Sequence, residues 1–110
     1  MTTPVDELSK TFAALADPTR REILKMLTEG EASVNELAEP FPISVQAVSK
    51  HLKVLERAGL ISRSRAARLR PSRIRGDALR DATEWLHGYH RFWSDSLDRM
   101  DERLRSGEDG

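Results

Sequence analysis

The sequence predicts a mainly α-helical fold of five helices with one small two-stranded β-ribbon. Three observations lead to this fold class. A short helix, a tight turn and a longer helix follow one another between Ser33 and Leu60. An arginine-rich segment with loosely alternating apolar and polar residues comes next. A long helical stretch with a seven-residue apolar repeat follows Gly76. The 110 residues suffice for one domain, expected over residues 1–105, with a disordered tail over 106–110.

Capping and proline signals set the bounds of the central helix pair. Ser33, with Glu36 three residues later, forms a capping box at the start of the short helix. Pro40 and Pro42 end this helix, and Ser44 caps the longer helix. Gly59 occupies a typical left-handed C-terminal position. The apolar residues of the longer helix recur at helical spacing and are Ala47, Val48, Leu52 and Leu55.

The opposite face of the longer helix carries side chains that suit a DNA major groove. These are Gln46, Ser49, Lys50 and Lys53, which include donors and cations for base edges and phosphates. An ordinary amphipathic helix also has a solvated polar face, so this face alone does not establish DNA binding.

The charge distribution favours a polyanionic partner, although the net charge is zero. Residues 41–80 contain ten Lys or Arg and two acids, a net +8, whereas residues 1–40 and 81–110 carry −4 each. Six arginines and no acid occur between Ile61 and Arg75. Such a run is either a solvated segment or, directly after a helix-turn-helix, a wing along the phosphate backbone. We favour the wing, which makes the predicted fold a winged helix-turn-helix.

Two further helices are expected ahead of this pair. The first starts at Thr2–Pro4, and its apolar seam consists of Val5, Leu8, Phe12 and Leu15. That seam fits intramolecular packing and a dimer contact equally well. The second starts at Asp17–Pro18 and stops at Gly30. Arg20 and Arg21 lie in its first turn, where the helix dipole disfavours cations, so we expect an ion pair in preference to a phosphate contact.

The last helix is expected to run from Gly76 to about Leu104 and to carry more apolar surface than a small domain can cover. One seven-residue series contains Leu79, Leu86, Trp93 and Met100, and a second contains His90, Leu97 and Leu104. Trp85, Tyr89 and Phe92 widen this stripe. Self-association through this helix is the natural interpretation.

Composition and motifs weigh against several other classes of function. The chain has no cysteine, which excludes disulfides and thiolate metal sites and makes a cytoplasmic setting the default. It shows no apolar run near the length of a membrane span and no signal-peptide pattern. It also lacks a glycine-rich phosphate loop, and Ser49 and His51, two residues apart on a helix, would not face each other as nucleophile and base. We expect no enzyme activity, no cofactor and no membrane partner.

Three segments together resemble the core of the ArsR-type winged-helix regulators, and the last helix resembles a cysteine-free branch of that family. They are Asp17-Pro-Thr-Arg20, Ser49-Lys-His51-Leu52 and Leu55-Glu-Arg-Ala-Gly-Leu60, within a resemblance that spans about residues 5 to 75. The resemblance implies a homodimer formed by the first and last helices, and a repressor of its own gene that an inducer releases from a palindromic operator. It implies DNA contacts by Ser44, Gln46, Ser49, Lys50, His51, Lys53, Arg63, Arg65 and Arg68. It implies dimer contacts by Leu8, Phe12, Leu86, Trp93, Leu97 and Met100.

Two alternatives remain open. A metal-responsive repressor could use Glu84, His87 and His90, because residues three apart share a helix face. This spacing does not match the family's metal sites, and His90 falls in the apolar seam, so we predict no metal and place these histidines at the dimer interface. The other alternative is a winged-helix module that binds a protein through its last helix. The sequence identifies neither the inducer nor the operator.

Overall fold

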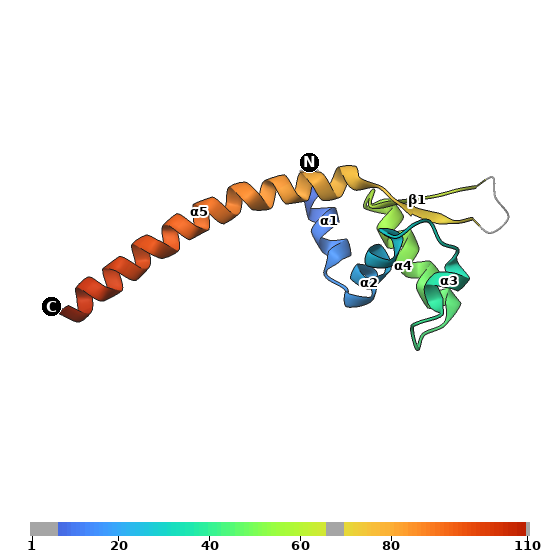
Figure 1. Cartoon of the computed structure of the whole chain (residues 1–110), viewed down its shortest axis with the longest axis horizontal. Helices are drawn as coiled ribbons and strands as arrows, with labels where there is room; N and C mark the ends of the chain where they lie inside the picture. The colour runs from blue at the N-terminus through green and yellow to red at the C-terminus, as the bar shows by residue number, and fades with distance from the viewer. Residues whose placement is uncertain (1–6, 66–69, 110) are drawn as a thin grey trace, which may run out of the picture.

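The computed structural model describes residues 7–65 and 70–109. Within these ranges it contains five helices and one two-stranded antiparallel sheet, which confirms the predicted winged helix-turn-helix (Figure 1). The elements are α1 Glu7–Leu15, α2 Pro18–Leu27, α3 Val34–Ala38, α4 Val45–Arg57, β1 Ile61–Arg63, β2 Ser72–Ile74 and α5 Gly76–Asp109. The expected helix start at Thr2–Pro4 lies outside the described residues.

The hydrophobic core lies where α2, α3 and α4 meet the sheet. Eight large side chains from these elements and the segment before β1 are at most 2% exposed: Ile23, Leu27, Leu37, Val48, Leu52, Leu55, Leu60 and Ile61. Burying one side chain of this size stabilises a fold by about 1.5–3 kcal/mol. This shared core therefore fixes the α3–α4 pair against α2 and the base of the wing.

The predicted β-ribbon is present and is fastened to the helical body by a third segment. β1 and β2 pair with Ile61 opposite Ile74 and Arg63 opposite Ser72. Ala32, just before α3, forms an additional antiparallel bridge with Ser72, in which the two main-chain hydrogen bonds measure 2.8 and 3.0 Å. The expected connection at residues 66–67 lies outside the described residues.

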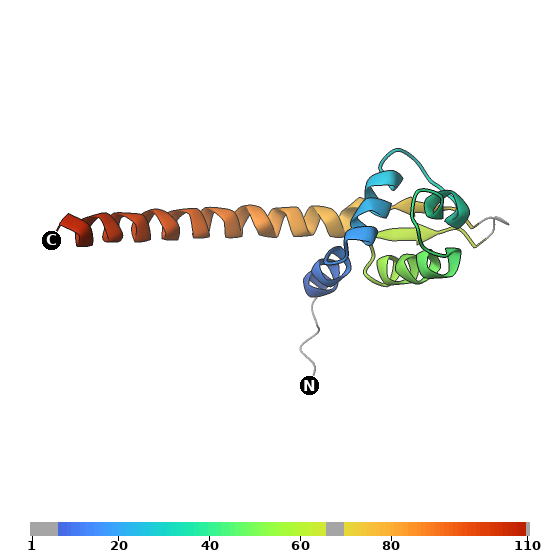
Figure 2. The ribbon, with the colours of Figure 1, turned by 90° about the horizontal axis from the view of Figure 1, so that it is seen from below.

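The last helix, α5, is one continuous 34-residue helix and gives the molecule its extents of 70 × 37 × 26 Å (Figure 2). Its N-terminal part packs against α1, where the rings of Phe12 and Trp85 meet edge to face at 5.7 Å. It continues to Asp109, five residues past the expected end, and so includes most of the expected tail. An Arg105–Asp101 ion pair supports this last stretch. In the described part of the chain, no helix is long and apolar enough to cross a membrane.

Candidate nucleic-acid interface

Local hydrogen bonds fix both helices of the helix-turn-helix. The amide of Glu36 donates to Ser33 Oγ at 3.2 Å, and the amide of Ser33 donates to Glu36 Oε1 at 2.9 Å, which is the predicted capping box. The Ser33 amide is the main reason that the pKa of Glu36 lies below its usual value. At the start of α4, Ser44 Oγ accepts from the amide of Ala47 at 3.1 Å. Ser44, a predicted DNA contact, is therefore also the cap of α4.

Helix α4 separates its buried and exposed sides sharply. Its apolar side contains three residues that are 0% exposed: Val48, Leu52 and Leu55. Gln46, Lys50 and Lys53, which were predicted to face DNA, are exposed, and Ser49 is half-buried at the edge of the same face. The exposed side chains are free to meet base edges and phosphates, while the buried ones hold the helix on the core.

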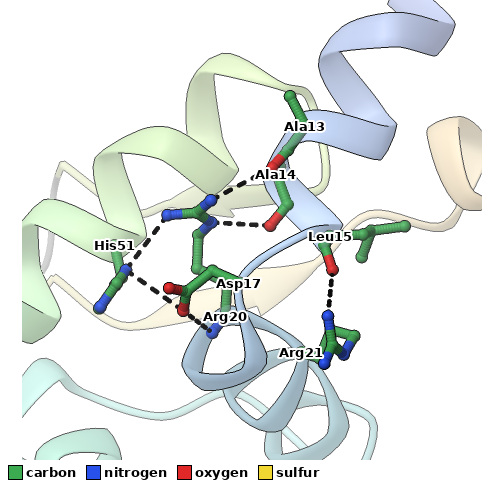
Figure 3. Close-up of polar contacts among 7 residues, drawn as sticks. All are labelled: Ala13, Ala14, Leu15, Asp17, Arg20, Arg21 and His51. Atoms are coloured by element: carbon green, nitrogen blue, oxygen red, sulfur yellow. Dashed lines mark hydrogen bonds and ion pairs between the residues drawn. The ribbon is translucent and has the colours of Figure 1, made fainter.

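His51 lies apart from this exposed row and contacts the start of α2 (Figure 3). Its Nδ1 atom lies 3.9 Å from Asp17 Oδ2 and 3.4 Å from Arg20 Nη1, and its side chain is 22% exposed. The pKa of Asp17 is lowered chiefly by a hydrogen bond from the Arg20 amide, and also by the charges of His51 and Arg20. The Nδ1 edge of the ring is thus used within the protein, and a DNA contact by His51 stays a prediction.

Arg20 and Arg21 bind the end of α1 through main-chain carbonyls. Arg20 donates from Nε to the Ala14 carbonyl at 2.7 Å and from Nη2 to the Ala13 carbonyl at 3.2 Å. Arg21 donates from Nη1 to the Leu15 carbonyl at 2.7 Å. The last carbonyls of a helix lack helical partners and carry the negative end of its dipole. The expected ion pair was wrong: among the described residues, neither guanidinium forms a salt bridge with a carboxylate.

The three predicted wing arginines differ in their surroundings. Arg63 is half-buried opposite Ser72, and its Nε is buried with no hydrogen-bond partner among the residues described. Arg65 is exposed just beyond β1. Arg68 lies outside the described residues. Arg65 is therefore the better placed of the two described arginines for a phosphate contact.

Two exposed arginines that were not predicted as DNA contacts extend the basic surface. Arg57 follows Lys53 by one helical turn, so helical spacing could have identified it. Arg70 has a φ of 45° as the chain returns to β2, a conformation that is uncommon for a residue other than glycine. In contrast, Arg73 lies 4.0 Å from the carboxylate of Glu31, which partly neutralises it.

The predicted dimer residues of α5 form an apolar stripe that none of the described residues covers. Their exposed fractions are 48% for Leu86, 46% for Trp93, 56% for Leu97 and 58% for Met100. Leu8 and Phe12 on α1 are half-buried, because α1 packs against α5 within the same chain. The α1 seam thus has an intramolecular partner, whereas the distal stripe of α5 has none among the described residues.

The alternative metal site on α5 gains no support from a single chain. Glu84, His87 and His90 are exposed, and His90 Nε2 lies 3.5 Å from Ser94 Oγ. Across residues 7–65 and 70–109, no three His, Asp or Glu side chains are grouped closely enough to hold a metal ion.

Known transcription regulators are similar to most of this chain. Residues 15–63 match the family model described as a helix-turn-helix domain. The transcriptional repressor SdpR of Bacillus subtilis is 34% identical over 79 residues, which cover 72% of this chain and 88% of SdpR. The crystal structure of an ArsR family transcriptional regulator has a TM-score of 0.75 at 36% identity, covering 81% of this chain and 98% of its own. An ArsR-like regulator from Rhodococcus sp. RHA1 has a TM-score of 0.72 at 34% identity, covering 87% and 91%.

Proposed function

Because the chain belongs to the ArsR-type family of winged helix-turn-helix DNA-binding transcriptional regulators, we propose that it acts as a homodimeric repressor of its own gene. In this proposal two copies bind a palindromic operator in double-stranded DNA, and an inducer releases them. Two recognition helices related by a two-fold axis would read half-sites about 10 base pairs apart.

The main support for this proposal is that α4 has a buried apolar face and an exposed polar face. The buried residues hold α4 rigidly on the core, and Gln46, Lys50 and Lys53 remain exposed in one row. Amide and ammonium groups in such a row suit hydrogen bonds to base edges and charge contacts to phosphates. Arg65 after β1 and Arg70 before β2 supply further exposed cations.

The unpartnered stripe of α5 supports the dimer. Six apolar side chains between Leu86 and Leu104 are each at least 46% exposed: Leu86, Phe92, Trp93, Leu97, Met100 and Leu104. Exposing a continuous apolar face of this length to water is unfavourable. A second copy of α5 offers the same stripe and can cover it with two-fold symmetry.

A direct test measures DNA binding and mass on the same preparation. Fluorescence anisotropy with DNA from the protein's own promoter should show binding that excess unrelated DNA does not abolish. Multi-angle light scattering should give the mass of two chains. Affinity should fall steeply between 50 and 200 mM salt, by roughly a hundredfold or more. Absence of binding at low salt would contradict the proposal. Binding-site selection on random DNA would then define the operator.

A further inference from the structure

We propose that a pocket between α1 and α4 binds a small organic anion with an apolar body, such as an aromatic or short-chain carboxylate, and that this ligand acts as the inducer. The second half of this inference rests on the proposed function; the binding site itself does not.

The pocket has the size and lining of a small-molecule site. Its volume is about 610 Å³, within the range of roughly 300–1,000 Å³ that is usual for ligand pockets. Ala13 and Ala14 come from the last turn of α1, and Val54 and Ala58 come from the end of α4. Three of these four side chains are single methyl groups, which leaves the space between the two helices unfilled. The apolar part of a ligand would lie on this floor.

The polar groups around the pocket are all cationic. Lys10, Arg20 and Arg57 line it together with the four apolar residues, and no acidic side chain does so among the residues described. Several cations beside an apolar surface of low dielectric raise the local potential and favour an anion. An arginine also offers paired donors that match the two oxygens of a carboxylate.

Arg57 is available for such a contact. The carbonyls of Val54 and Glu56 at the end of α4 accept hydrogen bonds from the amides of Ala58 and Gly59, so they do not need the guanidinium of Arg57 as a cap. In the described part of the chain, the Arg57 side chain has no hydrogen-bond or ion-pair partner. It is also exposed, so it can turn towards a ligand without breaking an existing contact.

The other two cations are placed differently. Arg20 uses Nε and Nη2 to bind the carbonyls of Ala14 and Ala13, so it contributes charge at a fixed position. Lys10 Nζ lies 3.3 Å from Glu7 Oε1, but both side chains are largely exposed, at 49% and 80%. A surface pair of this kind contributes little to stability. Lys10 can therefore exchange Glu7 for a bound anion at small cost.

The position of the pocket connects it to DNA binding. One wall belongs to α1, which packs against α5, and the other belongs to the last turn of α4. Arg57 follows Lys53 by four residues and Lys50 by seven, so it continues their exposed row. A ligand that binds Arg57 would remove one cation from this row and would favour one spacing of α1 and α4. Such differential binding is what couples a ligand to DNA affinity.

Naphthalene carboxylate is a suitable probe, and its neutral carboxamide is the matched control. We expect the carboxylate, in amide NMR titration of the full chain, to shift the signals of Ala13, Ala14, Val54 and Ala58, and to bind at least tenfold more tightly than the carboxamide. Ala13→Phe, at an exposed helical position, should fill the pocket and abolish these shifts. Arg57→Gln should weaken carboxylate binding severalfold, whereas Arg103→Gln on distal α5 should not. Shifts confined to α5, or none at millimolar probe, would overturn the proposal.

Operator binding separates this inference from the proposed function. Carboxylate should weaken DNA binding of the unsubstituted protein at least tenfold and leave Ala13→Phe unaffected. If the protein binds its operator but not the carboxylate, the pocket proposal fails and the proposed function stands. If it binds the carboxylate but no DNA, the proposed function and the inducer role fail together, and the site remains. If Arg57→Gln lowers the salt slope of DNA binding by about one unit without changing probe affinity, Arg57 contacts DNA phosphate and the proposal is wrong.

Discussion

The Nη1 atom of Arg20 at the start of α2 lies 3.4 Å from Nδ1 of His51 on α4. The same guanidinium binds the carbonyls of Ala13 and Ala14 at the end of α1. One side chain therefore joins the helix that packs on α5 to the helix that presents Lys50 and Lys53 (Figure 3).

Replacing Arg20 should destabilise the fold more than replacing its neighbour. Arg20→Ala leaves the half-buried Ala14 carbonyl without its side-chain donor, and such a loss costs about 1–3 kcal/mol. It also removes an exposed hydrogen bond to the Ala13 carbonyl, which still accepts from the Ala16 amide. Urea unfolding followed by circular dichroism measures this free energy. Arg21→Ala is the matched control, because Arg21 is exposed and makes one hydrogen bond to the Leu15 carbonyl. If the two variants lose equal free energy of unfolding, the contacts of Arg20 stabilise the fold no more than the single contact of Arg21.

Acid should weaken the starts of α2 and α3 together. Hydrogen bonds from main-chain amides hold the pKa of Asp17 and of Glu36 below their ordinary values. A carboxylate with a lowered folded-state pKa stabilises fully above its unfolded pKa of about 4, and it loses this contribution as the pH falls through the folded value. The free energy of unfolding in urea should therefore decrease as the pH is lowered from about 5 towards 2.

Variants with uncharged capping side chains test whether Asp17 and Glu36 cause this dependence of stability on pH. Asp17→Asn keeps an N-cap acceptor and removes the titrating charge, so the dependence of stability on pH should become shallower. Glu36→Gln should act in the same way for the capping box. Glu22→Gln alters an exposed carboxylate on α2 that has no partner among the described residues, and it should leave the dependence unchanged. If Asp17→Asn and Glu36→Gln retain the wild-type dependence of stability on pH, other groups cause the loss of stability in acid.

The exposed lysines of α4 should contribute separately to DNA affinity. Lys50→Ala and Lys53→Ala should each weaken operator binding, and each phosphate contact that is lost should lower the salt slope by about one unit. A lysine that reads a base would instead reduce discrimination between operator and mutated operator. Anisotropy titrations at several salt concentrations distinguish these effects. Arg103→Ala removes one exposed cation from distal α5 and should change neither quantity; an equal effect there would point to net charge as the cause.

Short-range sequence signals made the helix-turn-helix predictable. The contacts between segments that are distant in the sequence were not predictable. Ser33, Glu36 and Ser44 act on residues within three positions, so their caps could be read directly from the sequence. The bridge between Ala32 and Ser72 joins segments forty residues apart that lack strong β-propensity. No pattern predicts it.

The side-chain environment of the candidate site was only partly predictable. Helical spacing identified Gln46, Lys50 and Lys53 as exposed, because it separates them from the buried stripe. Arg20 contacts two main-chain carbonyls and the ring of His51. Because every residue has a carbonyl, no sequence pattern marks these two as partners, and the sequence suggested a carboxylate instead. The same limit applies to His51, whose neighbours come from another helix.

Disrupting the apolar stripe of α5 should dissociate the dimer and weaken DNA binding together. Trp93 is 46% exposed in the single chain, and Leu97 is 56% exposed one turn later. Trp93→Glu would place a charge inside the symmetric contact, where burying an unpaired carboxylate is costly. Light scattering should give the mass of one chain, and operator affinity should fall because one half-site binds alone. Arg91→Glu, on the opposite face of α5, changes charge without touching the stripe and should remain dimeric. A dimeric Trp93→Glu variant would require that the two copies meet elsewhere, and the long apolar stripe would then need a different partner.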